Sequence, residues 1–221
     1  MKSSSFPQPS ASQLARLPPW PRIVVGAACL DFVNTIDPRV GDNSRDHVTD
    51  YRTLLSWSVH AGALRSATRA RLEKEAARDE RQAADVFARA IAFREALYQA
   101  AAAQAAGRPV PAQSIDRILA AIRHAWQHAR LGRFDRRYAV QPLADLDMPL
   151  STLAFGAGQL FTSDRWTTIR MCEAHGCGWV FFDSRKGPHR RWCSMAVCGN
   201  REKVRRHARR QRRASADSKS H

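Results

Sequence analysis

Four cysteines near the carboxyl terminus constrain the fold of this chain more than any other feature of its sequence. They fall within 27 residues in the pattern C-x4-C-x15-C-x4-C, whereas the fifth cysteine, Cys29, lies far away. A tetrahedral zinc site needs four soft ligands at one point, and two short cysteine pairs with a spacer of this length supply them without a large core. We therefore predict one structural Zn²⁺ bound by Cys172, Cys177, Cys193 and Cys198.

Two alternatives to this ligand set are weaker. Disulfide bonds are rare in reducing compartments, and the opening of the chain is rich in serine and proline without the apolar core of a signal peptide. His175 and His189 lie beside the cysteine pairs, but four thiolates already complete a closed site. Because no position is left for water at the metal, we expect the zinc to be structural rather than catalytic.

The residues around the cysteines predict a treble-clef-like zinc finger. Between the pairs, GWVFFDSRKGPHRRW is typical of a β-hairpin, with Trp179 and Phe181 on one strand face, a turn at RKGP and a return strand at HRRW. The residues after Cys198 favour a helix. Val204, Ala208 and Gln211 are expected to rest on the hairpin.

Basic residues are concentrated beside these cysteines. The chain has a formal net charge of +16, and residues 172–221 contain thirteen Lys or Arg but only four Asp or Glu. The positive electrostatic potential of such a segment favours binding of a polyanion, with nucleic acid first and an anionic membrane surface second. A solvated basic tail stays open as the simpler explanation. Some of the arginines also offset the negative charge of four thiolates. The cationic residues that we assign to nucleic-acid binding are Arg190, Arg191, Arg201, Lys203, Arg205, Arg206, Arg209, Arg210, Arg212 and Arg213.

The residues before the finger predict a mostly α domain with a few short strands, so that the chain is α+β overall. The clearest core helix has Val86, Ala90, Phe93 and Leu97 at helical spacing. We expect a strand within 22–36, followed by a helix at about 49–60. A second helix is expected from a Ser66 cap to Asp79, a third at about 82–106, and a fourth from a Ser114 cap to Gly132. A strand over 133–143 and a helix over 148–161 complete the domain. The face expected to be buried after Ser114 consists of Ile115, Ile118, Leu119, Ile122 and Trp126.

A polar group in this domain is a candidate binding site. Asp31 and Asn34 lie near the end of the expected strand, and Arg94 lies on the core side of the 82–106 helix, so that together they are candidates to bind a small effector. The structural alternative, which we favour, is a set of hydrogen bonds that joins strand to helix. No nucleophile elbow, phosphate loop or HExxH motif is present and Cys29 fits a packed thiol, so we expect no enzymatic activity.

The sequence RRWCSMAVCGNREK resembles the signature of the CGNR zinc-finger family, named for residues 198–201. In that family the finger follows an amino-terminal ABATE domain. The segments CLDFVNTI (29–36), LLSWSVHAG (54–62) and AFREALYQ (92–99) are similar to their counterparts in ABATE domains, and the resemblance covers about residues 22–213. It implies a stress-induced transcription regulator.

The expected function is therefore a zinc-finger transcription regulator that binds double-stranded DNA and responds to stress or to a small-molecule effector. Two alternatives stay open, namely binding of structured RNA and docking of a protein partner by the finger. We also expect a homodimer, no membrane span, and a cytoplasmic location, nucleoid-associated if the source is bacterial. The expected domain limits are a disordered tail at 1–20, an ABATE-like domain at 21–163, a CGNR-type zinc finger at 168–213 and a disordered tail at 214–221.

Overall fold

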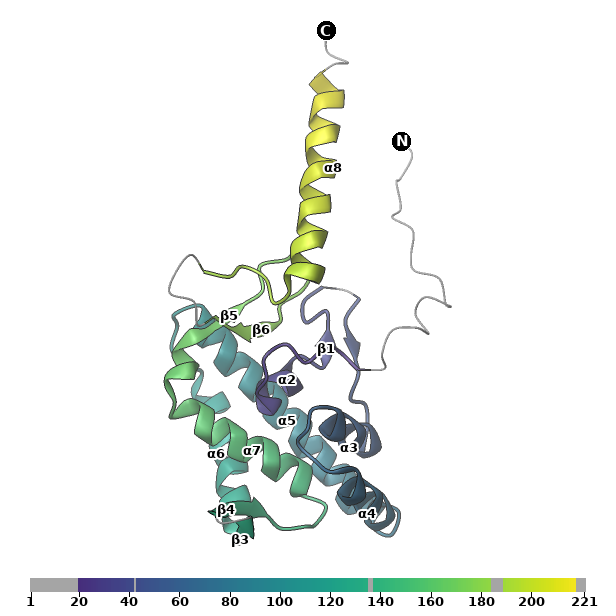
Figure 1. Cartoon of the computed structure of the whole chain (residues 1–221), viewed down its shortest axis with the longest axis vertical. Helices are drawn as coiled ribbons and strands as arrows, with labels where there is room; N and C mark the ends of the chain where they lie inside the picture. Colours follow the sequence, from purple (N-terminus) through teal and green to yellow (C-terminus); the bar gives the residue numbers. More distant parts are fainter. Residues whose placement is uncertain (1–19, 42, 135–136, 184–188, 218–221) are drawn as a thin grey trace.

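The computed structural model describes residues 20–41, 43–134, 137–183 and 189–217. Within these residues the chain is mostly helical with short strands (Figure 1), which confirms the predicted fold class. The helices are α2 (Ala28–Val33), α3 (Tyr51–His60), α4 (Ser66–Ala76), α5 (Glu80–Ala105), α6 (Ala112–Gln127), α7 (Met148–Phe161) and α8 (Asn200–Asp217). Residues 1–19 of the predicted amino-terminal tail and the predicted turn at 185–188 lie outside the described residues.

The strands form antiparallel pairs. The first pair is β1 (Ile36–Asp37) with β2 (Arg45–Asp46), the second is β3 (Ala129–Phe134) with β4 (Arg137–Pro142), and the third is β5 (Ile169–Met171) with β6 (Val180–Phe182). We predicted one strand over 133–143, but the structure has the β3–β4 hairpin there. Its first strand begins directly after α6, so that Gly132 lies within β3 and does not end a helix.

Helix α5 is the central element of the amino-terminal domain. The predicted stripe of Val86, Ala90, Phe93 and Leu97 is at most 2% exposed, and α2, α3, α6 and α7 all contact this helix. The Asp79 carboxylate accepts a hydrogen bond from the Gln82 backbone nitrogen at 2.9 Å, which caps the first turn. The predicted break near Asp79 is therefore confirmed, and its cause is an N-cap.

The predicted strand within residues 22–36 is wrong, because helix α2 occupies its second half. The Asp31 carboxylate accepts hydrogen bonds from the four backbone nitrogens of residues 24–27, at 2.9–3.2 Å. These bonds fold the β-branched segment back onto the first turn of α2, where a carboxylate is also favoured by the helix dipole. The run of valine and isoleucine at 23–25 favoured a strand, but its backbone donors are taken by one side chain.

Two predicted serine caps are also wrong. Arg65 and Pro111 are the N-cap residues of α4 and α6, and neither makes a side-chain cap hydrogen bond. Ser66 is instead the first residue of α4. The Ser114 hydroxyl donates to Oε1 of Gln99 on α5 at 2.7 Å, so this serine joins two helices rather than capping one.

The predicted buried face of α6 is only partly buried. Ile118 is 3% exposed, but Ile115, Leu119 and Trp126 are 49%, 38% and 56% exposed. The helix lies at the edge of the domain and contacts α5 and α7 along one side only, so part of its apolar face is open to solvent. These side chains and α7 line a groove of about 650 Å³.

The finger is not built as predicted between the two cysteine pairs. Strand β6 pairs with β5, which precedes Cys172, and residues 189–192 form no strand. Ile169 of β5 and Val180 of β6 are fully buried in the same core as the amino-terminal domain. The finger hairpin is therefore anchored to that domain on one face.

Helix α8 projects away from the rest of the molecule (Figure 1). We predicted that Val204 would rest on a hairpin, but this side chain is 62% exposed. The helix also extends to Asp217, so residues 214–217 are helical and not part of a disordered tail. Among the described residues, no helix is both long and apolar enough to cross a membrane.

Candidate metal centre and nucleic-acid interface

The four predicted ligands converge on one point. The Sγ atoms of Cys172, Cys177, Cys193 and Cys198 all lie within 4.8 Å of one another, and all four side chains are buried. The Cys177–Cys193 and Cys193–Cys198 Sγ distances are 3.8 Å and 3.5 Å. Tetrahedral zinc with Zn–S bonds of about 2.3 Å places its sulfurs about 3.8 Å apart, whereas a disulfide needs about 2.05 Å. The four cysteines form a site for one zinc ion, which we call the zinc centre.

Local backbone geometry builds the first half of the zinc centre. Cys172 and Cys177 lie in the turn that joins β5 to β6, and the Cys172 nitrogen donates to the Trp179 carbonyl oxygen at 2.8 Å. The turn passes through Gly178 at φ +67°, where an added Cβ would lie 2.9 Å from Val40 Cγ1. Both the left-handed backbone and the close approach of Val40 require glycine at this position.

The second half of the zinc centre leads directly into α8. Cys198 lies in a single wide turn, Met195–Gly199, which the Gly199 nitrogen closes by donating to the Ser194 carbonyl oxygen at 3.0 Å. Helix α8 begins at the next residue, Asn200. The metal therefore fixes the root of α8 through Cys198.

The electrostatics of the zinc centre favour a divalent cation. Hydrogen bonds from the other three thiols, that of Cys177 first, lower the pKa of Cys172. Cys177 and Cys193 each form a hydrogen bond with Cys172, and in both cases this bond is the largest cause that raises the pKa of the thiol. Four thiolates in this space repel one another, and a dication removes that conflict by displacing the protons.

Three of the predicted nucleic-acid residues have structural contacts at the zinc centre. Arg190 donates to the carbonyl oxygens of Trp192, at 2.7 Å, and of Cys193. Arg191 forms a salt bridge with Glu173 at 2.6 Å. Arg201 Nη2 lies 3.6 Å from Cys198 Sγ, where its charge stabilises the thiolate. The sequence argument that some arginines offset the thiolate charge thus applies most directly to Arg201.

The remaining predicted residues lie on α8. Among the described residues, none of these side chains forms a salt bridge: Lys203, Arg205, Arg206, Arg209, Arg210 and Arg212. The side chain of Arg213 lies outside the described residues. The acidic residue of the first turn, Glu202, accepts a hydrogen bond from the His175 nitrogen at 3.0 Å and so ties α8 to the first cysteine pair.

The three candidate effector residues contact different parts of the chain. Asp31 binds the backbone of residues 24–27, as described above. Asn34 bonds through its amide to the backbone of Val180. Arg94, which is 2% exposed, donates from two guanidinium nitrogens to Asp46 at 2.8 Å and 2.6 Å. These internal hydrogen bonds correspond to the structural alternative.

The sequence analysis missed the contacts that join the two domains. Besides the Asn34–Val180 pair, the Trp179 indole nitrogen donates to the Ile36 carbonyl oxygen at 3.0 Å, and the Arg39 nitrogen donates to the Cys177 carbonyl oxygen at 2.7 Å. The partners are about 140 residues apart, and no local pattern in one sequence reports such pairs. Cys29 is buried as predicted, and burial raises its pKa to about 12.

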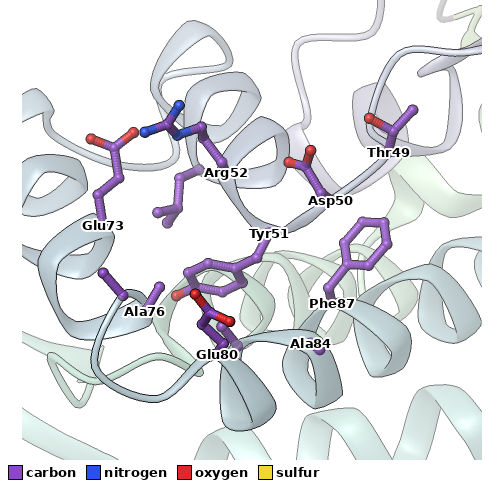
Figure 2. Close-up of a pocket in the computed structure, with 12 residues that line it drawn as sticks. Thr49, Asp50, Tyr51, Arg52, Glu73, Ala76, Glu80, Ala84 and Phe87 are labelled. Carbon is purple, nitrogen blue, oxygen red and sulfur yellow. The ribbon is translucent and has the colours of Figure 1, made fainter.

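A pocket of about 450 Å³ lies between α3, α4 and α5 (Figure 2). Tyr51 forms part of its wall, and its hydroxyl donates to the Leu146 carbonyl oxygen at 2.7 Å. Of the charged side chains at its rim, Asp50 caps α3 and Glu73 pairs with Arg69 at 2.9 Å. Arg52 and Glu80 also line the pocket, and neither forms a salt bridge among the described residues.

Two family models match the chain. The ABATE model, described as "Putative stress-induced transcription regulator", matches residues 26–164, and the CGNR zinc finger model matches residues 168–211. No curated protein matches the sequence significantly. The first model covers more than half of the chain, and the second contains all four ligands of the zinc centre. The chain therefore belongs to the family of ABATE-domain proteins that carry a CGNR zinc finger.

Proposed function

We propose that this protein regulates transcription by binding double-stranded DNA through α8 and the zinc centre. The observation that carries the proposal is the row of six cationic side chains on α8, from Lys203 to Arg212, which have no acidic partner among the described residues. Because the helix projects from the body, these side chains can reach a polyanion without a clash with the ABATE domain (Figure 1).

The dimensions of α8 fit a duplex. The major groove of B-DNA is about 12 Å wide and admits an α-helix, while phosphates lie along both of its edges. Arginine side chains all around a helix reach both edges at once. Because the zinc centre holds the root of this helix, less conformational entropy is lost on binding than for a free basic tail.

The contacts at the zinc centre divide the predicted residues into two groups. Arg190 and Arg201 bond within the finger, so we assign them to the stability of the zinc centre. We assign the DNA contacts to the cationic side chains on α8, namely Lys203, Arg205, Arg206, Arg209, Arg210 and Arg212. Arg191, 62% exposed in its side chain, keeps donors for a phosphate beside its bond to Glu173.

The test is binding of a fluorescent duplex by the zinc-loaded full chain, measured by anisotropy against salt concentration. We expect binding that weakens steeply, with a log–log slope of about 0.9 for each phosphate contacted. The variant with Arg205, Arg206, Arg209 and Arg210 changed to Gln should bind much more weakly and show a shallower slope.

The matched control removes the same charge from the ABATE domain. It changes Arg78, Arg81, Arg117 and Arg123 to Gln, all of which are exposed and outside the finger. The proposal fails if no duplex binds at low ionic strength, or if the two quadruple variants lose affinity equally. Preferential displacement of the duplex by structured RNA would assign the same surface to RNA.

A further inference from the structure

Helix α6 has two apolar faces, and the domain core covers one of them. Ile118 and Ala125 are at most 3% exposed and belong to the core that α5 and α7 share. Ile115, Leu119 and Trp126 lie on the neighbouring face, are 38–56% exposed, and line the groove of about 650 Å³ between α6 and α7. The second face is therefore apolar without being part of the core.

The exposed apolar surface of the molecule is concentrated around this face. Of the eleven large apolar side chains that are exposed among the described residues, six lie between residues 115 and 143. We call these six the α6 patch, which consists of Ile115, Leu119, Trp126, Leu131, Val140 and Leu143. Leu131 and Val140 are cross-strand partners in the β3–β4 hairpin that follows α6. The α6 patch thus continues from the helix onto the hairpin.

The area of the α6 patch is sufficient for a stable dimer. A large apolar residue has about 200 Å² of surface, so the exposed fractions of the six side chains amount to about 600 Å². Each partner of a standard interface buries about 800 Å², of which somewhat more than half is apolar. A small ligand in the groove would leave the hairpin part of this surface in water, whereas a protein partner can cover all of it.

The spacing of the groove residues on α6 fits a second copy of the same helix. The stripe consists of Ile115, Leu119, Ile122 and Trp126, at intervals of four, three and four residues. This alternation is the seam of two helices that pack side by side. In an antiparallel pair, the first residue of one stripe lies opposite the last residue of the other, and the two middle residues face each other. The stripe is therefore complementary to itself about a two-fold axis.

Charged residues beside the stripe are also complementary in that arrangement. Asp116 and Arg123 are exposed, and within the described part of the chain neither forms a salt bridge. They lie seven residues apart, so they flank the stripe on the same side. An antiparallel pair brings Asp116 of each copy close to Arg123 of the other, twice by symmetry. The other side of the stripe is occupied by Ile118 and Ala125, which face the core of their own chain.

We propose that the α6 patch binds a second copy of this chain and forms a symmetric dimer with an antiparallel α6–α6 contact. Because α7 borders the groove, the interface is a bundle of four helices, two from each chain. The Trp126 ring packs edge-on against Phe155 of α7, with ring centroids 5.2 Å apart, so this part of the surface is preformed. Helix α8 projects from the end of the molecule opposite the β3–β4 hairpin (Figure 1), so dimerisation leaves it accessible.

The first experiment is sedimentation velocity of the zinc-loaded full chain over a range of concentrations. It contains no DNA, so its result does not depend on the proposed function. We expect a particle of twice the mass of one chain. In Ile115→Glu/Leu119→Glu, carboxylates without partners enter the seam, and this variant should be monomeric. A wild type that stays monomeric at every concentration would overturn the proposal and leave the α6 patch to another protein or to an apolar small molecule.

The matched control is Gln113→Glu/Ala120→Glu. It makes the same change in net charge on the same helix, at two exposed positions outside the stripe, and should remain a dimer. Zinc content and thermal unfolding of both variants are measured, and both should fold because all four replaced side chains are exposed. A dimer that persists in Ile115→Glu/Leu119→Glu would form through another surface and contradict the proposal.

The second experiment tests the antiparallel register and keeps the apolar stripe intact. Asp116→Arg and Arg123→Asp each place like charges opposite each other twice, so each should raise the dissociation constant of the dimer at least about tenfold. The combined variant restores opposite charges and should dimerise nearly as well as the wild type. If it dimerises no better than the single variants, the proposed contact is wrong.

The DNA-binding control described above contains Arg123→Gln, which removes the attraction at this position without adding repulsion. Exposed ion pairs contribute about 0.2–1 kcal/mol, so that control should remain largely dimeric. Its sedimentation is measured before its duplex affinity, which separates a loss of the dimer from a loss of DNA contacts.

Discussion

The side-chain amide of Asn34 pairs with the backbone of Val180, since its Nδ2 donates to the carbonyl oxygen at 2.9 Å and its Oδ1 accepts from the backbone nitrogen at 3.1 Å. Both residues are buried. One side chain at the end of α2 thus satisfies two backbone groups of β6, in the way that a neighbouring strand would. The ABATE domain and the finger share this polar contact inside a common core.

Loss of this pair should destabilise the whole chain. In Asn34→Ala, the Val180 nitrogen and carbonyl oxygen stay buried without partners, at a cost of about 1–3 kcal/mol for each unsatisfied group. We expect the free energy of unfolding of the zinc-loaded protein, from urea denaturation, to fall by about 3 kcal/mol. The control Asn43→Ala removes an exposed asparagine and should change the free energy of unfolding by less than about 0.5 kcal/mol. Equal effects of the two changes would show that the interdomain pair contributes little.

Loss of the buried guanidinium of Arg94 should lower the stability of the chain by a similarly large amount. Its side chain is 2% exposed and donates two hydrogen bonds to Asp46. Removal of one partner of such a pair costs about 3–5 kcal/mol, and we expect the lower end because Asp46 is 34% exposed and regains water. Arg94→Met should therefore lower the melting temperature clearly in a calorimetric scan.

The comparison for that change is Arg69→Met. Arg69 and Glu73 form a surface pair four residues apart on α4, and both are about a third exposed. Such pairs stabilise a helix by about 0.3–0.5 kcal/mol, so this variant should melt close to the wild type. A melting temperature of Arg94→Met as high as that of Arg69→Met would refute the structural role of Arg94.

Two features that local sequence determines, the zinc ligands and the core helix α5, were predicted correctly, whereas the Ser66 and Ser114 caps were not. Zinc ligation follows from the cysteine spacing alone, and α5 follows from one stripe of apolar residues that ends in a glycine. The errors arose where the partner of a segment is distant or unexpected. Helix α2 depends on one carboxylate that takes four backbone donors, and β6 has its partner before Cys172 rather than after it. Alternation of side chains indicates a strand but does not say which other strand it pairs with.

Removal of the metal should disorder the finger and abolish the proposed binding of duplex DNA. Native mass spectrometry should find one zinc ion per chain, and Cys193→Ser should lose most of it because a structural site needs all four thiolates. The matched control is Cys29→Ala, which removes a cysteine outside the zinc centre and should keep one zinc ion despite some loss of stability. Since zinc displaces thiol protons, the zinc affinity should also fall as the pH is lowered. Zinc retained fully in Cys193→Ser would contradict the ligand set.

The thiol of Cys29 should remain unreactive over a wide pH range. Burial raises its pKa to about 12, from an ordinary value of 9.0, so in the folded chain the thiol stays protonated below about pH 12. The thiolate is the form that attacks iodoacetamide. Between pH 7.5 and 9.5, the alkylation rate of Cys29 in the zinc-loaded protein should therefore stay low, whereas that of an exposed thiol rises. Mass spectrometry of peptides from the alkylated protein measures this rate, and the four ligands, alkylated after chelation of the zinc, serve as the internal control. Rapid modification of Cys29 before chelation would mean that this part of the core opens readily.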